Sequence, residues 1–101
     1  MSFRLIYDVE ATFEFREAVA WYEGQSQGLG VRFVLAVDEV MAAVSSQPLR
    51  FSKAGLKSRK ARIHGWPYSI YFAVNEAYSE VKVIAVWHGA RNPAELRRRL
   101  K

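Results

Sequence analysis

The sequence contains no cysteine and only two histidines among its 101 residues. Without cysteine there is no disulfide framework, no thiolate zinc site and no cysteine nucleophile. No metal-ligand spacing joins His64 and His88, and there is no glycine-rich phosphate loop, so we expect neither a metal nor a cofactor. Its apolar runs fall far short of the roughly 20 residues that a membrane-spanning helix needs. The N-terminus does not resemble a signal peptide, so we expect a soluble cytoplasmic protein.

The sequence does contain enough apolar side chain for a core. Half of the residues are apolar and 14% are aromatic. A chain of this length buries roughly two-thirds of its unfolded surface on folding. We therefore expect one domain that covers residues 1–101.

Charge is divided unevenly along the chain. Residues 1–49 carry three cations and seven carboxylates, a balance of −4, whereas residues 50–101 carry twelve cations and three carboxylates, a balance of +9. This division predicts that the second half forms a surface for a polyanion or an acidic partner. The alternative is a generally basic surface without a specific partner.

Hydrophobic periodicity predicts a strand, two helices and three further strands. Helical spacing begins after Asp8, a candidate N-cap, and we expect Gly24 to end the first helix. A second helical stripe runs from Phe33 to Val44 and ends before Pro48. The predicted first helix is residues 9–23, and the predicted strands are residues 3–7, 59–64, 68–74 and 80–88.

The order of these elements predicts an α+β fold. Short connections favour an antiparallel helical hairpin and antiparallel pairing of consecutive strands. The expected architecture is β-α-α-β-β-β, with the helical hairpin packed on one face of a small, mainly antiparallel sheet. The basic segment 94–101 is either a helical turn or a frayed tail, and the strand order stays open.

Strand alternation predicts which side chains share a face of the sheet. Lys60, Arg62 and His64 share the outward side of their strand. In the last strand one side holds Val81, Val83, Ala85 and Trp87, and the other holds Lys82, Ile84, Val86 and His88. If one sheet face is uncovered, cations surround an apolar centre there, which suits a nucleic acid or a flexible acidic peptide. The alternative is ordinary alternation on a solvated face.

Other polar residues have two interpretations each. His88 and Arg91 on a turn suit a phosphate group, but the favoured interpretation is a loop fixed by backbone hydrogen bonds of His88 and an ion pair of Arg91. Glu10, Glu14 and Glu17 at helical spacing predict a solvated helix face rather than an acid–base pair. Trp21 and Trp66 are expected to be packing residues or partner anchors.

Four stretches together resemble a known family. They are Glu17 to Glu23 (EAVAWYE), Gly28 to Phe33 (GLGVRF), Trp66 to Phe72 (WPYSIYF) and Val83 to Pro93 (VIAVWHGARNP). In this order and at these separations, the sequence resembles toxins of the RelE/ParE superfamily, the toxin half of type II toxin–antitoxin (plasmid stabilisation) systems. The resemblance implies the same β-α-α-β-β-β fold, a bacterial cytoplasmic origin, and an antitoxin whose C-terminal segment wraps the toxin.

The resemblance leaves two branches open. ParE-like members bind DNA gyrase and trap its cleaved-DNA complex, whereas RelE-like members cut messenger RNA on the ribosome without a metal. Tyr68 stands where such nucleases carry a strand arginine, and no tyrosine follows Tyr78 near the C-terminus. The Trp66-Pro67-Tyr68 motif and the turn from His88 to Pro93 are more ParE-like. A third possibility is a non-toxic remnant that only binds an antitoxin.

We therefore expect a ParE-like gyrase inhibitor neutralised by an antitoxin. The residues expected to contact the target are Arg59, Arg62, His88, Arg91, Arg97, Arg98 and Arg99. Trp21, Tyr22 and Phe33 are expected to contact the antitoxin, whose tail we expect to be acidic and disordered alone. The nuclease alternative places Lys60, Arg62 and His88 around one phosphate, with the ribosome and messenger RNA as partners. A homodimer or a hetero-oligomer is possible.

Overall fold

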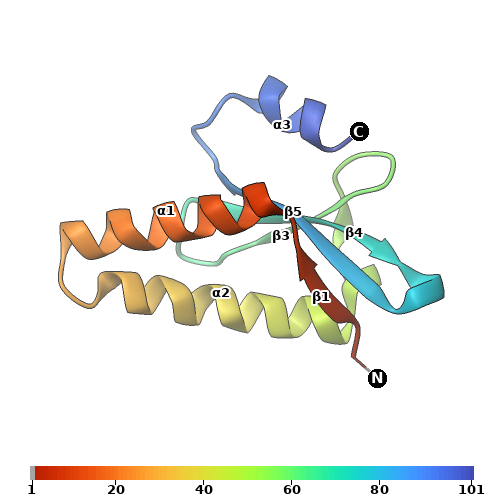
Figure 1. The fold of residues 1–101 in the computed structure, drawn as a ribbon, viewed down its shortest axis with the longest axis horizontal. Helices are drawn as coiled ribbons and strands as arrows, with labels where there is room; N and C mark the ends of the chain where they lie inside the picture. The colour runs from red at the N-terminus through yellow and green to blue at the C-terminus, as the bar shows by residue number, and fades with distance from the viewer. Residues whose placement is uncertain (1) are drawn as a thin grey trace.

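The computed structural model describes residues 2–101, in which a hairpin of two helices lies against a five-stranded sheet (Figure 1). Strand β1 (Arg4–Tyr7) leads into helix α1 (Val9–Gln25), and a short turn leads into helix α2 (Leu29–Ser46). The later elements are η1 (Pro48–Arg50), β2 (Ser52–Lys53), β3 (Arg59–Arg62), β4 (Tyr68–Asn75), η2 (Glu76–Tyr78), β5 (Glu80–His88) and α3 (Pro93–Arg99). Within residues 2–101, every helix is too short or too polar to span a bilayer.

Glycines close the turn between α1 and α2. The prediction that Gly24 ends α1 was wrong, because the helix continues one residue further. Gly28 instead makes the turn with a left-handed φ of 88°, which L side chains rarely adopt. Gly30 lies so close to α1 that a Cβ atom there would come within 2.8 Å of the Val19 carbonyl oxygen. The Glu23 carboxylate completes the turn by accepting hydrogen bonds from the N–H groups of Gly28 (2.8 Å) and Gly30 (2.9 Å).

The sheet order is β1-β5-β4-β3-β2, with β1 parallel to β5 at one edge and the other pairs antiparallel. The predicted order of elements and the antiparallel hairpins are confirmed. Strand β2 was missed, because two residues cannot show an alternating pattern. Strand β3 ends at Arg62, two residues earlier than expected. Asp8 precedes α1 as predicted, but its side chain makes no capping hydrogen bond and lies 3.5 Å from Lys82 Nζ.

An irregularity in β5 reverses its alternation. Tyr71 pairs with Ala85 and the next residue of β4 pairs with Val83, so Ile84 is an extra residue on β5. Before it, Val83 faces the helical hairpin, whereas after it Val86 does so. The expectation that Val81, Val83, Ala85 and Trp87 share one side was therefore wrong: the last two lie in a separate cluster on the opposite face.

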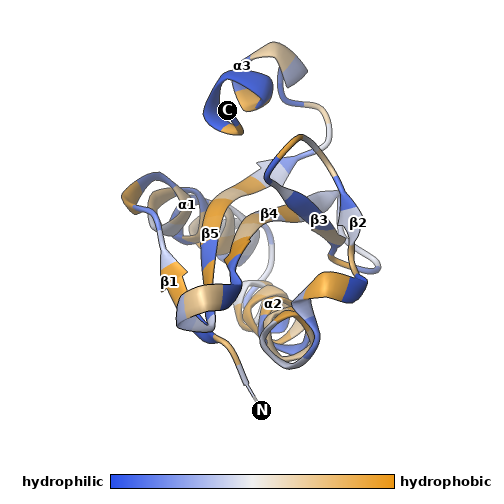
Figure 2. Cartoon of the chain, turned by 90° about the vertical axis from the view of Figure 1, so that its right-hand side faces the viewer, coloured by the Kyte–Doolittle hydropathy of each residue, from blue (hydrophilic) through white to orange (hydrophobic). Residues whose placement is uncertain are grey.

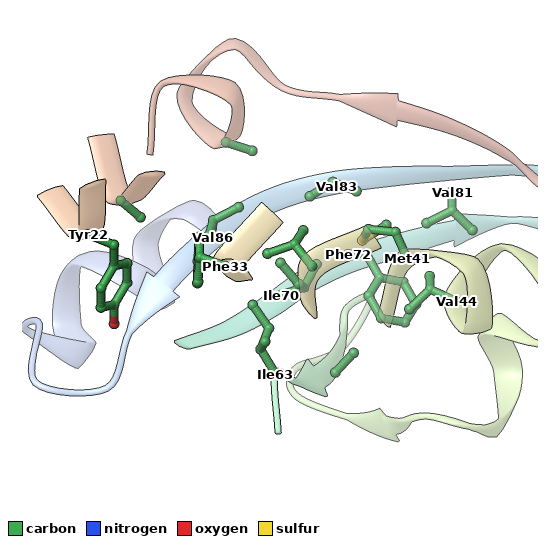
Figure 3. Packing of buried hydrophobic residues seen from close by; sticks show 14 residues of the cluster. Tyr22, Phe33, Met41, Val44, Ile63, Ile70, Phe72, Val81, Val83 and Val86 are labelled. Carbon is green, nitrogen blue, oxygen red and sulfur yellow. The ribbon is translucent and has the colours of Figure 1, made fainter. Parts of the chain in front are cut away.

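The main core lies between the sheet and the helical hairpin (Figure 3). Phe33 of α2 and Phe72 of β4 are both fully buried there. The Phe33 ring lies 5.1 Å from Tyr22 and 6.2 Å from Phe15, centroid to centroid, which joins the two helices. Edge-on contacts with Trp66 extend the aromatic packing towards the turn before β4.

Helix α3 covers the centre of the opposite face of the sheet (Figure 2). Leu96 packs there on Tyr71, Ala85 and Trp87, all of which are buried. The basic C-terminal segment is thus a helix and not a frayed tail. This face is therefore not left uncovered: its centre, at Tyr71, Ala85 and Trp87, is closed to a partner.

Candidate functional site

The sheet separates the three residues of the nuclease alternative. Residues paired directly across neighbouring strands share a face. Lys60 pairs with Tyr71, which lies beneath α3, and Arg62 is two residues further along the same strand. His88 pairs with Tyr68, which packs against the core of the hairpin. The expectation that one face gathers Lys60, Arg62 and His88 was therefore wrong, because the extra residue in β5 turns His88 to the hairpin side.

Four of the seven predicted target contacts hold the protein's own fold. The Arg59 guanidinium donates to the carbonyl oxygens of Phe51 (2.7 Å) and Leu49 (3.2 Å). His88 accepts a hydrogen bond from the Ala90 N–H, and Arg91 and Arg99 pair with Glu14. The other three, Arg62, Arg97 and Arg98, are exposed and form no ion pair within residues 2–101.

Glu14 of α1 is the centre of a polar cluster at the edge of β5. Strand β1 pairs with β5 only as far as Val83, so the edge beyond it needs other partners. The Glu14 carboxylate accepts from the Val86 N–H (3.1 Å) and from the Arg99 guanidinium (2.6 and 3.1 Å). Arg91 also pairs with Glu14. Arg99 donates in turn to the Ile84 carbonyl oxygen (2.6 Å), so two side chains satisfy the open strand edge.

The protonation of Glu14 follows from these contacts. Burial alone would raise the pKa of its carboxyl, since the side chain is only 10% exposed. The hydrogen bonds from Arg99, from the Val86 N–H and from Arg91 outweigh that effect and lower the pKa below its ordinary value. Glu14 is therefore ionised near neutral pH. The prediction of a solvated face was right for Glu10 and Glu17, which are exposed, and wrong for Glu14.

Trp87 provides the apolar part of the same attachment. The guanidinium carbon of Arg91 lies 3.8 Å from the Trp87 ring centroid, and that of Arg99 lies 5.4 Å from it. Cation–π contacts of this kind are worth about 0.5–2 kcal/mol, more as they are desolvated. Together with Leu96, they fix the C-terminal segment to the sheet and, through Glu14, to α1.

A groove of about 970 Å³ runs between α1 and the end of β5. Phe13 and Trp21 line its α1 side and are 63% and 59% exposed, which is unusual for aromatic side chains. Val86 and His88 line its β5 side, and Arg91 lies at its end towards α3. The groove is thus mainly apolar, with a few charged groups around it.

His88 and Tyr68 form the floor of this groove at the end of the sheet. The His88 Nδ1 accepts a hydrogen bond from the Ala90 N–H (2.9 Å), and its ring meets Tyr68 edge-on at 5.0 Å. Burial, followed by the nearby Tyr22 and Glu14, raises the pKa of Tyr68, so its phenol stays protonated. Of the two interpretations of the turn, the one with a backbone hydrogen bond and an ion pair describes these side chains.

The predicted antitoxin contacts are only partly at the surface. Trp21 lines the groove, but Tyr22 and Phe33 are core residues. Sequence reasoning missed Val9 and Phe13, which also line the groove. Their spacing of four residues, continued at Trp21, marks a second apolar line on α1 beside the core-facing one. That spacing was the available signal.

The margins of the face that carries α3 are basic. Lys60 and Arg62 come from β3, and Arg97 and Arg98 come from α3. All four side chains are exposed, and within the part of the chain that the structure describes none is in an ion pair. We call these four residues the basic face.

Solved structures from toxin–antitoxin systems share this architecture. A chain of the RelBE2 toxin–antitoxin complex from Mycobacterium tuberculosis superposes with a TM-score of 0.65 at 17% identity, over 87% of this chain and 99% of that chain. A chain of the chromosomal ParDE system from P. aeruginosa superposes with a TM-score of 0.70 at 14% identity, over 86% and 96%. At these identities the likeness establishes the fold, which is the RelE/ParE-like α+β fold expected from the sequence.

The family follows from the sequence itself. The family model described as the ParE toxin of the type II toxin–antitoxin system parDE matches residues 5–93. This chain therefore belongs to the ParE toxin family, as its four motifs indicated. The comparison with curated protein sequences gave no match.

Proposed function

We propose that this ParE-family toxin inhibits DNA gyrase by binding the enzyme in its cleaved-DNA complex. Membership of the ParE family over residues 5–93 carries the proposal. The separation of Lys60 and Arg62 from His88 supports it further, because metal-free RNA cleavage needs a base, an acid and cations around one phosphate. We place the toxin in the cytoplasm with its target, and we assign contact with the gyrase–DNA complex to the exposed Arg62, Arg97 and Arg98.

A gyrase assay tests this proposal. Purified toxin added to gyrase and relaxed plasmid is expected to stop supercoiling and to leave DNA breaks that appear when gyrase is denatured. In cells, expression without an antitoxin is expected to induce the DNA-damage response before messages are lost. Rapid loss of translated messages without DNA breaks would support the nuclease instead. Unaffected growth would support a non-toxic remnant.

We further propose that the groove beside α1 receives the antitoxin. The two solved structures described above are toxin–antitoxin systems by description, and the groove exposes Phe13 and Trp21 as anchors. Exposed aromatic side chains at the centre of an interface commonly supply most of its binding energy. An acidic tail would lay apolar side chains on them and direct carboxylates towards Arg91. Folding of such a tail is expected to bury on the order of 2,000 Å² or more in total.

Calorimetry with the antitoxin tests the groove. Binding is expected to show a negative heat-capacity change, and its absence would contradict coupled folding. Phe13→Ala and Trp21→Ala are each expected to weaken binding about tenfold or more. Leu35→Ala is the matched control, because Leu35 is as exposed as they are but lies on α2 outside the groove. Equal weakening by all three variants would place the antitoxin elsewhere.

A further inference from the structure

We propose that the basic face, made of Lys60, Arg62, Arg97 and Arg98, binds the phosphate backbone of duplex DNA. This inference deepens the proposed function and rests on it for the setting, a toxin that meets gyrase while gyrase holds DNA. The group that these four cations contact is the phosphate of the DNA backbone. None of the four forms an ion pair within residues 2–101, and Lys60 Nζ lies 5.9 Å from the Tyr71 ring centroid.

The acidic side chains near this face already have partners. On α3, the Glu95 carboxylate lies 3.5 Å from the Arg91 guanidinium. At the far end of the sheet, Glu80 pairs with Arg4. Glu14 is engaged by Arg91 and Arg99. The charges of Lys60, Arg62, Arg97 and Arg98 are therefore available to an external anion.

The geometry of β3 and α3 places these cations on two sides of the covered centre. Lys60 and Arg62 are two residues apart on a strand, so they point the same way about 6.6 Å from each other. On α3, Arg99 reaches towards α1, and Arg97 precedes it by two residues, about 200° around the helix. Arg97 therefore stands on the flank of α3 opposite to Arg99. Figure 2 shows α1 and β3 on opposite sides below α3.

The covered centre favours a nucleic acid over a protein as the occupant. Protein partners are usually held by aromatic and aliphatic anchors at the middle of an interface. Here the middle of the face is already occupied, because Leu96 covers Tyr71 and Trp87. The margins of the face expose these four cations around an internal apolar cluster, which matches a partner recognised by its phosphates.

The same observation favours duplex over single-stranded nucleic acid. Single strands bind by stacking their bases on exposed aromatic side chains. Trp87 is 4% exposed and carries the Arg91 guanidinium on its ring, and Tyr71 is 9% exposed. Neither ring can accept a base while α3 is in place. A duplex needs no such platform, because its backbone presents phosphates alone.

Fluorescence anisotropy with labelled duplex DNA of mixed sequence, in the absence of gyrase, tests the proposal. Four phosphate contacts predict that the logarithm of the binding constant falls with the logarithm of salt concentration with a slope of about −3.6. Lys60→Glu with Arg62→Glu is expected to weaken binding at least about tenfold near 100 mM salt and to reduce that slope by about 2. Arg97→Glu with Arg98→Glu is expected to have a similar effect.

Arg16→Glu with Arg32→Glu is the matched control. These two arginines lie exposed on the helical hairpin, and their reversal changes the net charge by the same amount. Binding is expected to weaken less than about threefold with an unchanged slope. Circular dichroism and thermal melting check that all variants are folded, and Lys60→Ala with Arg62→Ala repeats the test if charge reversal unfolds the chain.

Three results would overturn the inference. One is an equal loss of binding in the control pair, which would mean general attraction by net charge. Another is tighter binding of single-stranded RNA than of duplex DNA. The third is no DNA binding near 100 mM salt, where specific phosphate contacts still hold. Because the measurement contains no gyrase, DNA binding without gyrase inhibition would contradict only the proposed function, and gyrase inhibition without DNA binding only this inference.

Discussion

Glu14 shows how one side chain can join elements that are far apart in sequence. It lies on α1, yet its partners Val86 and Arg99 are 72 and 85 residues away. Its spacing from Glu10 and Glu17 predicted a solvated face, and helical spacing alone could not distinguish it from them. The distinction comes from the end of β1 at Tyr7, which leaves the edge of β5 open beside α1.

Glu14→Gln is expected to lower the free energy of unfolding by about 1–3 kcal/mol near pH 7. The amide keeps the shape of the side chain but replaces charge-assisted hydrogen bonds to Arg99 and Arg91 with weaker ones. Urea denaturation measures the change. Glu17→Gln, one turn further along α1 and exposed, is the control and is expected to change stability by less than about 0.5 kcal/mol. Equal effects of the two variants would contradict the role given to Glu14.

The stabilisation by Glu14 is also expected to depend on pH. The pKa of Glu14 is lowered in the folded protein from an ordinary value of 4.5. The ionised side chain therefore stabilises the folded protein more than the protonated side chain does. The contribution of Glu14 to the free energy of unfolding is therefore complete above pH 4.5. It is lost as the pH falls through the lower pKa that Glu14 has in the folded protein. The stability difference between the native sequence and Glu14→Gln should shrink below about pH 4. An undiminished difference in acid would refute this linkage.

Trp21 and Phe33 were both predicted to contact the antitoxin, but Trp21 is exposed and Phe33 is buried. Their substitutions are therefore expected to differ in their effect on stability. Phe33→Ala is expected to cost about 3–5 kcal/mol of stability, because it leaves a cavity between the hairpin and the sheet. Trp21→Ala is expected to cost less than about 1 kcal/mol, since most of that ring is in solvent. Thermal melting of the two variants measures the contrast. A large loss of stability in Trp21→Ala would show that it belongs to the core.

At the level of elements, α1 and α2 could be predicted from their helical apolar stripes, and β4 and β5 from their long β-prone runs. The extra residue at Ile84 could not be predicted from the sequence. Residues 83–86 are all apolar, so no alternation of polar and apolar residues shows where the strand changes face. That single residue decides on which face His88 lies. Strict alternation along β5 therefore assigned residues beyond Ile84 to the wrong face, although the fold itself was predicted correctly.

Helix α3 is expected to depend on Leu96 for its attachment. Leu96→Ala removes the largest buried side chain of a seven-residue helix, which is too short to be stable alone. We expect a cost of about 2–3 kcal/mol and faster amide exchange throughout residues 94–99. Arg98→Ala, on the exposed side of the same helix, should leave exchange unchanged. Equal exchange in both variants would mean that the ion pairs with Glu14 suffice to hold α3.

At the scale of the whole molecule, the charge division along the sequence becomes a spatial one. The acidic residues of the first half lie mostly on the helical hairpin, whereas the cations of the second half lie on the later strands, their loops and α3. In Figure 2 the hairpin and α3 lie on opposite sides of the sheet. This follows from a topology in which one layer precedes the other along the chain. Composition alone therefore predicted that one side would be basic. It could not predict that α3 would cover the centre of that side, because seven residues rich in arginine carry no long apolar stripe.

The same topology predicts the order of folding. Strands β4 and β5 are neighbours in sequence, whereas β1 pairs with β5 across 76 residues, as between Arg4 and Glu80. Contacts with long sequence separation carry a larger loop-closure cost and tend to form late. Leu5→Ala in β1 is therefore expected to accelerate unfolding with little effect on the folding rate. Ile70→Ala in β4 is expected to slow folding, because the hairpin it belongs to forms in the transition state.

Stopped-flow folding and unfolding in urea separates these effects. Both substitutions remove apolar side chains that pack in the core, so each is expected to change stability by about 2 kcal/mol or more, enough for a reliable ratio of kinetic to equilibrium change. That ratio should be near zero for Leu5→Ala and above about 0.5 for Ile70→Ala. If Leu5→Ala slowed folding as much as Ile70→Ala, the edge strand would belong to the nucleus. The fold would then close around β1 and β5 first, and the local hairpins would follow.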